Sequence, residues 1–435
     1  MSEVAVGGIG FFLLLMFMAA GLHVAVAMFG IGLLGAISYL GLPAALELGR
    51  QFWGASNNFV LIAIPLYVLL GELLVRGGFT DKMYESVSQW VRFLPGGLLH
   101  TNIGASALFA AVSGSSVATA ATISTIAIPA FKKRVFDPRL IFGTIAVGAT
   151  LGILIPPSIN LIVYGALTGV SVGKLYLAAF IPGFSLAGLF ILTTIVWCLR
   201  NPSVAGTKEK MLPLAVRVKE LRHLFAPVLI IAMVMGSIYL GWATPTESAA
   251  LGVVTVLILC VISRRLTLKM LHESLLATIS TSAIIMLIMV SAFYLTFILG
   301  VIGMPQTLAN YVRELNVSPL QLIIIVTLFY LFLGCFLDAL AMIIATIPIV
   351  YPIIQSAQID PIWFGIYLII MCCIGLVTPP VGMVLYVVQS VRGEGSIATV
   401  IAGVLPYVVI MLLFAVLLYI FPQIALWLPS IGAAS

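Results

Sequence analysis

Long apolar runs separated by short polar links dominate the sequence. Runs of about 20 apolar residues are typical of helices that cross a lipid bilayer. The pattern predicts an all-α integral membrane protein with roughly ten to twelve spans, counting two re-entrant hairpins and two broken helices. The N-terminal run lacks a basic segment and a small-residue cleavage site, so it is interpreted as a span and not as a signal peptide. The uninterrupted spans are expected at 4–28, 30–48, 58–75, 176–199, 225–241, 247–262, 274–300 and 397–420.

Two apolar runs contain adjacent prolines near their middle. Pro156-Pro157 interrupts the run 140–167, and Pro379-Pro380 interrupts the run 362–390. Each proline removes a backbone donor and cannot continue a helix, so both spans should break there. Because free backbone groups in hydrocarbon are costly unless they line a cavity or bind a ligand, the two breaks indicate a transport site.

Two further apolar stretches are interrupted by small or polar residues. The stretch 94–129 is interrupted at Ser113-Gly114-Ser115-Ser116, and the stretch 319–356 at Gly334-Cys335-Phe336-Leu337-Asp338. The halves of the first stretch are short for a full crossing. Each stretch is therefore predicted to form a helical hairpin that enters and leaves on one side.

The hairpin and the broken span that follows it occur twice, at about 100–185 and 323–408. Several prolines and an Asp-Pro pair at one offset indicate an internal duplication. A shift of 223 residues places Pro129 on Pro352, Asp137-Pro138 on Asp360-Pro361, Gly152 on Gly375, Pro156-Pro157 on Pro379-Pro380 and Ser115 on Asp338.

The repeats divide the chain into scaffold and transport segments. We expect N-terminal scaffold spans at 1–92 and a first transport unit at 93–185. Further scaffold spans, with a cytoplasmic link at 200–223, occupy 186–318. The second transport unit follows at 319–408, and residues 409–435 form the end of the last span and a tail.

The distribution of basic residues indicates how the repeats are oriented. With the N-terminus outside, all but Arg50, Lys174 and Arg313 of the 20 Lys and Arg residues fall on one face. That bias follows the positive-inside rule. It places the first hairpin on the cytoplasmic side and the second on the outer side, so the two repeats have inverted topology.

Composition excludes a soluble protein and gives no support to an enzyme. The chain is 62% hydrophobic and 8% charged, with a mean hydropathy of +1.24, whereas charged residues normally make up about a quarter of a globular chain. The five cysteines fall within apolar runs and are interpreted as buried thiols. The histidines are scattered and no Walker motif is present, so we predict neither metal catalysis nor ATP hydrolysis. Thr244-Pro245-Thr246-Glu247 predicts a capping box, in which Glu247 caps a helix.

Asp338 is the strongest candidate for cation binding. It is the only carboxylate between Glu314 and Asp360, and a lone acid in an apolar stretch is usually functional. The alternative is a cap on the helix that follows, and both roles are compatible. Unwound backbone supplies further oxygen ligands for a hard cation such as sodium. The first sodium site is expected at Ser113, Gly114, Ser115, Ser116, Gly148 and Gly152, and the second at Gly334, Cys335, Asp338, Gly375 and Thr378.

The substrate is expected at the two breaks. Half-helix N-termini at Ser158 and Val381 present N–H donors and positive dipole ends to an anion. No Arg or Lys lies at that depth, so recognition should depend on polar groups such as Asn160 and on backbone amides. The expected contacts are Pro156, Pro157, Ser158, Asn160, Pro379, Pro380, Val381 and Gly382.

Five short motifs stand between about residues 50 and 410. They are Ser113–Ala120 (SGSSVATA), Gly152–Ser158 (GILIPPS), Ser171–Lys174 (SVGK), Thr244–Glu247 (TPTE) and Thr378–Gly382 (TPPVG). None is specific alone, but together they resemble the large membrane subunit of tripartite ATP-independent periplasmic (TRAP) transporters.

The resemblance implies a sodium-coupled importer of organic acids in the bacterial cytoplasmic membrane. Family substrates include dicarboxylates, 2-oxo acids and sialic acids. It also implies an elevator movement, sodium as the coupling ion without an organic cofactor, an extracytoplasmic substrate-binding protein and a four-span small subunit. Because the chain starts at the first large-subunit span, we expect the small subunit to be separate. The alternatives are a stand-alone anion:sodium symporter and a channel.

Overall fold

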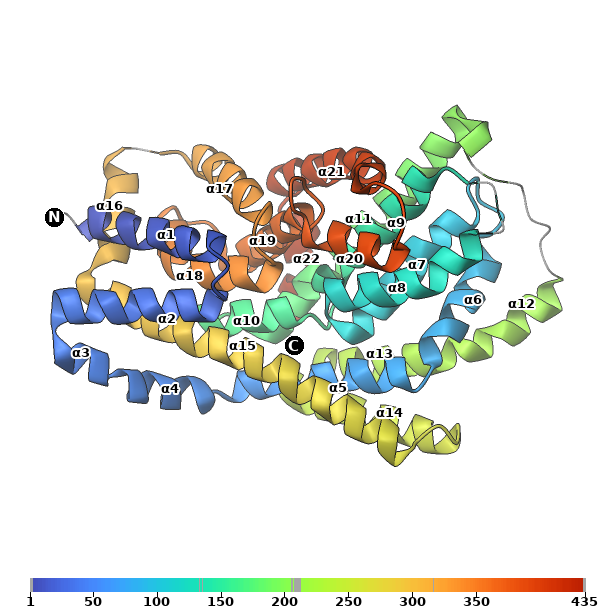
Figure 1. Ribbon diagram of the computed structural model, residues 1–435, viewed down its shortest axis with the longest axis horizontal. Helices are drawn as coiled ribbons and strands as arrows, with labels where there is room; N and C mark the ends of the chain where they lie inside the picture. The colour runs from blue at the N-terminus through green and yellow to red at the C-terminus, as the bar shows by residue number, and fades with distance from the viewer. Residues whose placement is uncertain are drawn as a thin grey trace.

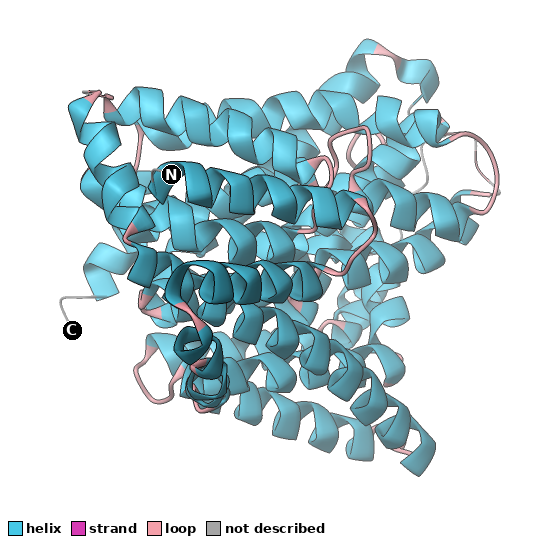
Figure 2. Ribbon diagram, turned by 60° about the vertical axis from the view of Figure 1, so that its left-hand side comes forward, coloured by secondary structure: helices cyan, strands magenta, loops and turns pink. Residues whose placement is uncertain are grey.

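The computed structural model describes residues 3–132, 134, 136–204, 206, 213–315 and 317–432. Within these ranges every regular element is a helix (Figure 2). Seven helices are long and apolar enough to cross a membrane, or eight if the bent pair Leu214–His223 and Phe225–Tyr239 counts as one span. Other apolar helices of 10–17 residues include hairpin arms and half-helices. The all-helical, multi-span architecture is confirmed, but spans counted by length alone are fewer than the roughly ten to twelve predicted.

One group of helices is arranged along the longest helix, α15 (Leu268–Ile302) (Figure 1). We call this group the α15 layer. α15 packs against α2, α4 and α5, α14 packs against α5, and α13 packs against α14. The other members of the layer are α1 (Glu3–Ala19), α2 (Val24–Gly35), α3 (Leu42–Leu46), α4 (Leu48–Ser56), α5 (Ala63–Arg76), α13 (Phe225–Tyr239) and α14 (Pro245–Ile262).

A second group contains the two hairpins and the two broken helices. The hairpin turns and the breaks lie where the sequence predicts them. The first set is α7 (Leu98–Ser113), α8 (Ser116–Phe131), α9 (Pro138–Leu154), α10 (Ile159–Thr168) and α11 (Val172–Arg200). The second set is α17 (Pro319–Gly334), α18 (Ala339–Ser356), α19 (Pro361–Gly375), α20 (Met383–Arg392) and α21 (Ile397–Ile420).

The two sets contact each other reciprocally. The half-helix α10 packs on α18, and its counterpart α20 packs on α8; likewise α9 packs on α21, and α19 packs on α11. The Sγ of Cys373 donates a hydrogen bond to the carbonyl of Thr150 at 3.3 Å, across a sequence separation of 223 residues. These residues are equivalent under the repeat shift. The contact between α9 and α19 therefore joins equivalent positions of the two repeats.

The polar links contain helices that the sequence pattern does not predict. They are α6 (Phe79–Val91), α12 (Leu214–Glu220) and α16 (Met304–Glu314). The Tyr84 hydroxyl of α6 donates to Asn102 Oδ1 at 2.6 Å, and Asn102 Nδ2 donates to Thr144 Oγ1 at 2.9 Å. This buried chain ties α6 to α7 and α9. Ser86 Oγ donates to the Glu220 carbonyl at 3.0 Å, so α6 also contacts the end of α12.

The predicted spans 4–28 and 30–48 are wrong. The first run is divided between α1 and α2 by a turn at Gly21, whose φ of +90° is unfavourable for a residue with a side chain. α2 continues as a π turn (Ala36–Leu40) that ends at Gly41, with a φ of +81°. Hydropathy does not report such breaks, because glycine does not interrupt an apolar run.

Two other sequence predictions are tested at helix ends. The capping box is confirmed: Thr244 Oγ1 accepts from Glu247 N at 3.3 Å, and Glu247 Oε2 accepts from Thr244 N at 2.7 Å. The expected tail contains a further helix, α22 (Gln423–Gly432), which packs on α11.

Candidate functional site

A cavity of about 340 Å³ lies where both hairpin tips face α5 and α15. Its volume lies within the range of small-molecule sites. Two of its polar side chains are carboxylates, and the lining drawn from the described residues includes no Lys or Arg. The polar lining residues are Glu72, Ser113, Ser115, Ser116, Asn160, Thr281 and Asp338.

The first hairpin tip is held by backbone and hydroxyl groups. Gly114 has a φ of +61°, which reverses the chain between α7 and α8. Ser115 Oγ accepts from Ala118 N at 3.3 Å and caps α8. Thr119 Oγ1 donates to the Ser115 carbonyl at 2.6 Å and lies 3.1 Å from Ser113 Oγ. The tip therefore gathers oxygen atoms at the cavity wall.

The two glycines assigned to the first sodium site differ in position. Gly152 lies against the tip, since a Cβ added there would be 2.8 Å from the Ser115 carbonyl oxygen. A Cβ added to Gly148 would instead be 2.9 Å from Ser106 Oγ and 3.2 Å from the Asn102 carbonyl oxygen. The structure thus brings Gly152 to Ser113–Ser116, whereas Gly148 lies against α7. Ser106, which the sequence reasoning missed, has a buried hydroxyl without a hydrogen-bond partner among the described atoms.

The second hairpin tip is built around the Asp338 carboxylate. Its two oxygens accept from Leu340 N at 3.2 Å and from Ala341 N at 3.3 Å, so Asp338 caps α18. Asp338 also belongs to the lining of the cavity, as Ser113–Ser116 does. The capping alternative is confirmed, and the carboxylate lies at the cavity wall.

The other members of the second sodium set surround the break after α19. The backbones of Gly334 and Gly375 touch, because a Cβ on Gly375 would be 2.6 Å from the Gly334 Cα. Cys335 Sγ donates to the Pro379 carbonyl at 3.3 Å, and Thr378 Oγ1 donates to the Ile374 carbonyl at 2.6 Å. The hairpin and the break are thereby held together.

The predicted substrate residues are not all at the cavity. Within the described part of the chain, Asn160 is the member of that set that lines it. Asn160 is 3% exposed, and its Oδ1 has no hydrogen-bond partner among the described atoms. A buried acceptor without a partner favours a ligand that donates a hydrogen bond.

The two breaks differ in burial and in where the half-helix that follows each of them begins. Pro156-Pro157 and Pro379-Pro380 are cis peptides. Ser158 is buried at the start of α10, and its hydroxyl donates to the Ile153 carbonyl at 2.5 Å. The second half-helix begins at Met383, not at Val381, because Gly382 is its N-cap with a φ of +50°. Val381 lies outside the helix and is 37% exposed.

The walls of the cavity that come from α5 and α15 were missed by the sequence reasoning. Val68, Gly71 and Glu72 come from α5, and Thr281 and Ile285 come from α15. One signal was available for Glu72: it is an acid inside an apolar helix, four residues before Arg76, a spacing that allows an ion pair.

Residues 11–424 match the family model described as "Tripartite ATP-independent periplasmic transporter, DctM component". The chain belongs to this family. It is therefore a multi-pass membrane transport protein, the large TRAP permease component, and not an enzyme.

Curated relatives extend over most of the permease. It is 33% identical to the Vibrio cholerae sialic acid TRAP transporter large permease protein SiaM, over 88% of this chain and 89% of that protein. It is 34% identical to the Pseudomonas aeruginosa C4-dicarboxylate TRAP transporter large permease protein DctM, over 92% and 93%. The Escherichia coli 2,3-diketo-L-gulonate TRAP transporter large permease protein YiaN is 29% identical, over 90% and 96%.

A solved structure shares the fold of the permease. The crystal structure of the Alcanivorax borkumensis YdaH transporter aligns with a TM-score of 0.61 and 18% sequence identity, over 87% of each chain. This similarity concerns the fold alone.

Proposed function

We propose that this permease imports small organic acids coupled to sodium, with a substrate-binding protein that delivers the acid from outside the cytoplasmic membrane. The observation that carries the proposal is the shared cavity between the two hairpin tips, whose lining includes Asp338 and the oxygen-rich segment Ser113–Ser116. A carboxylate with several neutral oxygens fits a hard cation. The relatives named for sialic acid, C4-dicarboxylates and 2,3-diketo-L-gulonate support the organic-acid class.

The first sodium ion is assigned to Ser113–Ser116 with Gly152, and the second to Asp338 with Gly334, Cys335, Gly375 and Thr378. The substrate is assigned to the cavity itself, where the side-chain oxygen Oδ1 of Asn160 is an available hydrogen-bond acceptor. The N-terminus of α10 at Ser158, two residues before Asn160, supplies a dipole end near it.

We further propose an inverted-topology elevator. The hairpins and broken helices within 93–185 and 319–408 (α7 to α10 and α17 to α20) move against the scaffold segments 1–92 and 186–318, and the side with most basic residues faces the cytoplasm. The reciprocal contacts of α10 with α18 and of α20 with α8 support movement of both repeats as one body. Membership in a tripartite family supports a small membrane subunit as partner.

Uptake measurements test this function. The permease is reconstituted in proteoliposomes with its small subunit and binding protein, and uptake of labelled succinate, pyruvate and N-acetylneuraminate is measured. Uptake of one acid should require an inward sodium gradient and should stop when choline replaces sodium. Uptake that is unchanged in choline would refute sodium coupling. Uptake by the permease alone would instead favour a stand-alone symporter, and non-saturable flux would favour a channel.

A further inference from the structure

The α5 wall of the cavity carries a charged group that neither the sodium nor the substrate assignment uses. Val68, Gly71, Glu72 and Val75 line the cavity over successive turns of α5. Glu72 is the second carboxylate of the lining, besides Asp338. It comes from the α15 layer, whereas Asp338 comes from a hairpin tip.

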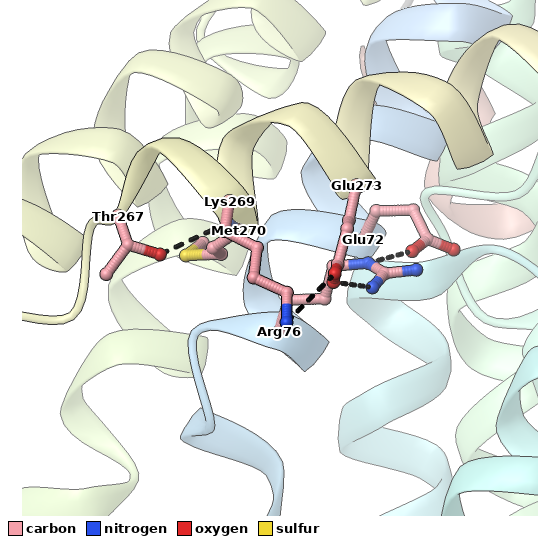
Figure 3. A network of polar contacts seen from close by, with 6 residues as sticks. All are labelled: Glu72, Arg76, Thr267, Lys269, Met270 and Glu273. Carbon is pink, nitrogen blue, oxygen red and sulfur yellow. Dashed lines mark hydrogen bonds and ion pairs between the residues drawn. The ribbon is translucent and has the colours of Figure 1, made fainter.

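Arg76 joins Glu72 to a second acid on the neighbouring helix. Arg76 Nε donates to Glu72 Oε2 at 3.0 Å, and Arg76 Nη1 donates to Glu273 Oε2 at 2.8 Å (Figure 3). The guanidinium therefore lies between a carboxylate that lines the cavity and a carboxylate of α15. Lys269 Nζ lies 4.0 Å from the other oxygen of Glu273, so the outer acid has a second cationic neighbour.

The two acids differ in what they face. Glu273 does not belong to the cavity lining, and its side chain is 42% exposed. Glu72 belongs to the lining, and Arg76 is its ion-pair partner among the described residues. Removing Arg76 would leave a carboxylate without a counter-charge at the cavity wall. An organic anion in the cavity would then be repelled, because like charges within ~4–6 Å of each other in a partly buried site disfavour one another.

We propose that Arg76 sets the charge selectivity of the cavity by neutralising Glu72, and so makes this wall permissive for an anionic substrate. The inference rests on the proposed import of organic acids. The pair acts on the affinity for substrate through its charge, and it lies on α5, outside the hairpin tips and breaks to which the sodium ligands are assigned. Arg76 and Glu72 are therefore positioning and specificity residues.

The test measures KM and the maximal rate in the reconstituted assembly, with whichever of succinate, pyruvate and N-acetylneuraminate the parent transports. Arg76→Gln should raise KM for the acid by about 3- to 10-fold, with a smaller change in the maximal rate. Glu72→Gln removes the repelling group, so its KM should equal or fall below that of the parent. The double variant E72Q/R76Q should restore KM to within about twofold of the parent.

The control separates charge selectivity from a helix clamp. R76Q/E273Q also removes two charges of the network but leaves Glu72 at the cavity, so it should keep the KM defect of R76Q. If the network only clamps α5 to α15, E72Q/R76Q and R76Q/E273Q should be equally defective, and that result would overturn the inference.

An increase in KM for E72Q alone would overturn it too, which covers the case in which R76Q does not fold. Absence of uptake by the parent would refute the proposed function. Normal uptake by the parent, with no recovery of KM in E72Q/R76Q, would refute this inference alone.

Discussion

The two hairpin tips occupy equivalent positions in the repeats, yet they end their first helices and begin their second ones differently. In the first, Gly114 and Ser115 make the turn, and a neutral hydroxyl caps α8. In the second, four residues separate the arms, and the Asp338 carboxylate caps α18 through both oxygens. Both tips satisfy free N–H groups, but only the second adds a charge. Capping is thus common to the repeats, and charge distinguishes them.

The two breaks also differ between the repeats, in their burial and in their local hydrogen bonds. The first spans 155–158 and is buried throughout, with Ser158 bonded back to Ile153. The second spans 376–382, and its Pro380 and Val381 are exposed. The first break is therefore fixed by local bonds, whereas the second has more freedom to change its contacts.

The largest effect is expected where hairpin and break touch in the second repeat. Gly375→Ala would place a Cβ 2.6 Å from the Gly334 Cα. Backbone atoms cannot rotate away, so we expect a loss of about 3 kcal/mol of stability. The equivalent change in the first repeat, Gly152→Ala, meets the Ser115 carbonyl oxygen at 2.8 Å and should cost about 2 kcal/mol. Thermal unfolding in detergent measures both.

A matched control exists on α11. A Cβ at Gly188 would meet no atom within 4 Å. Gly188→Ala should therefore leave the melting temperature unchanged or raise it, because alanine favours a helix by about 1 kcal/mol over glycine. Equal melting temperatures for G375A and G188A would show that the close approach of the two backbones has no energetic weight.

The second effect separates charge from capping at Asp338. Asp338→Asn keeps an oxygen that can cap α18 but removes the negative charge, so the sodium concentration for half-maximal uptake should rise about 10-fold with little loss of stability. Asp338→Ala also removes the cap and should cost a further ~1 kcal/mol. Sodium titration of uptake and thermal unfolding together distinguish the variants. Unchanged sodium dependence in both would leave Asp338 with the capping role alone.

The smallest effect tests the difference between the breaks. Ser158→Ala removes the buried hydroxyl that bonds the Ile153 carbonyl, and we expect a loss of about 1 kcal/mol. The equivalent Val381→Ala, at an exposed position, should change the melting temperature little. If both substitutions destabilise equally, the first break is not the more firmly held of the two.

Periodicity and proline placement predict the long helices, the hairpin turns and the breaks because these features depend on local chemistry. Pro156-Pro157 and Pro379-Pro380 cannot continue a helix in any tertiary setting. The capping box at Thr244 is equally local. By contrast, Gly21 reads as part of an apolar run, and the structure alone reveals the left-handed turn that ends α1.

The site is only partly predictable, because part of the cavity wall comes from α5 and α15, which are distant in sequence from the hairpin tips. Asp338 and Ser113–Ser116 are recognisable as unusual within apolar stretches. Glu72 and Thr281 become neighbours of those residues only when α5 and α15 pack beside the hairpins. Gly148 shows the converse: it lies in the expected helix but faces α7 and not the tip.

The single carboxylate at the second tip has an electrical consequence. If the hairpins move as proposed, the empty unit carries the negative charge of Asp338 through part of the membrane field, and one bound sodium ion cancels it. Moving one elementary charge across 100 mV is worth about 2.3 kcal/mol. The membrane voltage would then act on the return of the empty unit. On the loaded unit it would act on the net charge of Asp338, the bound sodium ions and the anionic acid together. Transport current, compared with the uptake of an acid of known charge, therefore reports how many sodium ions accompany each acid.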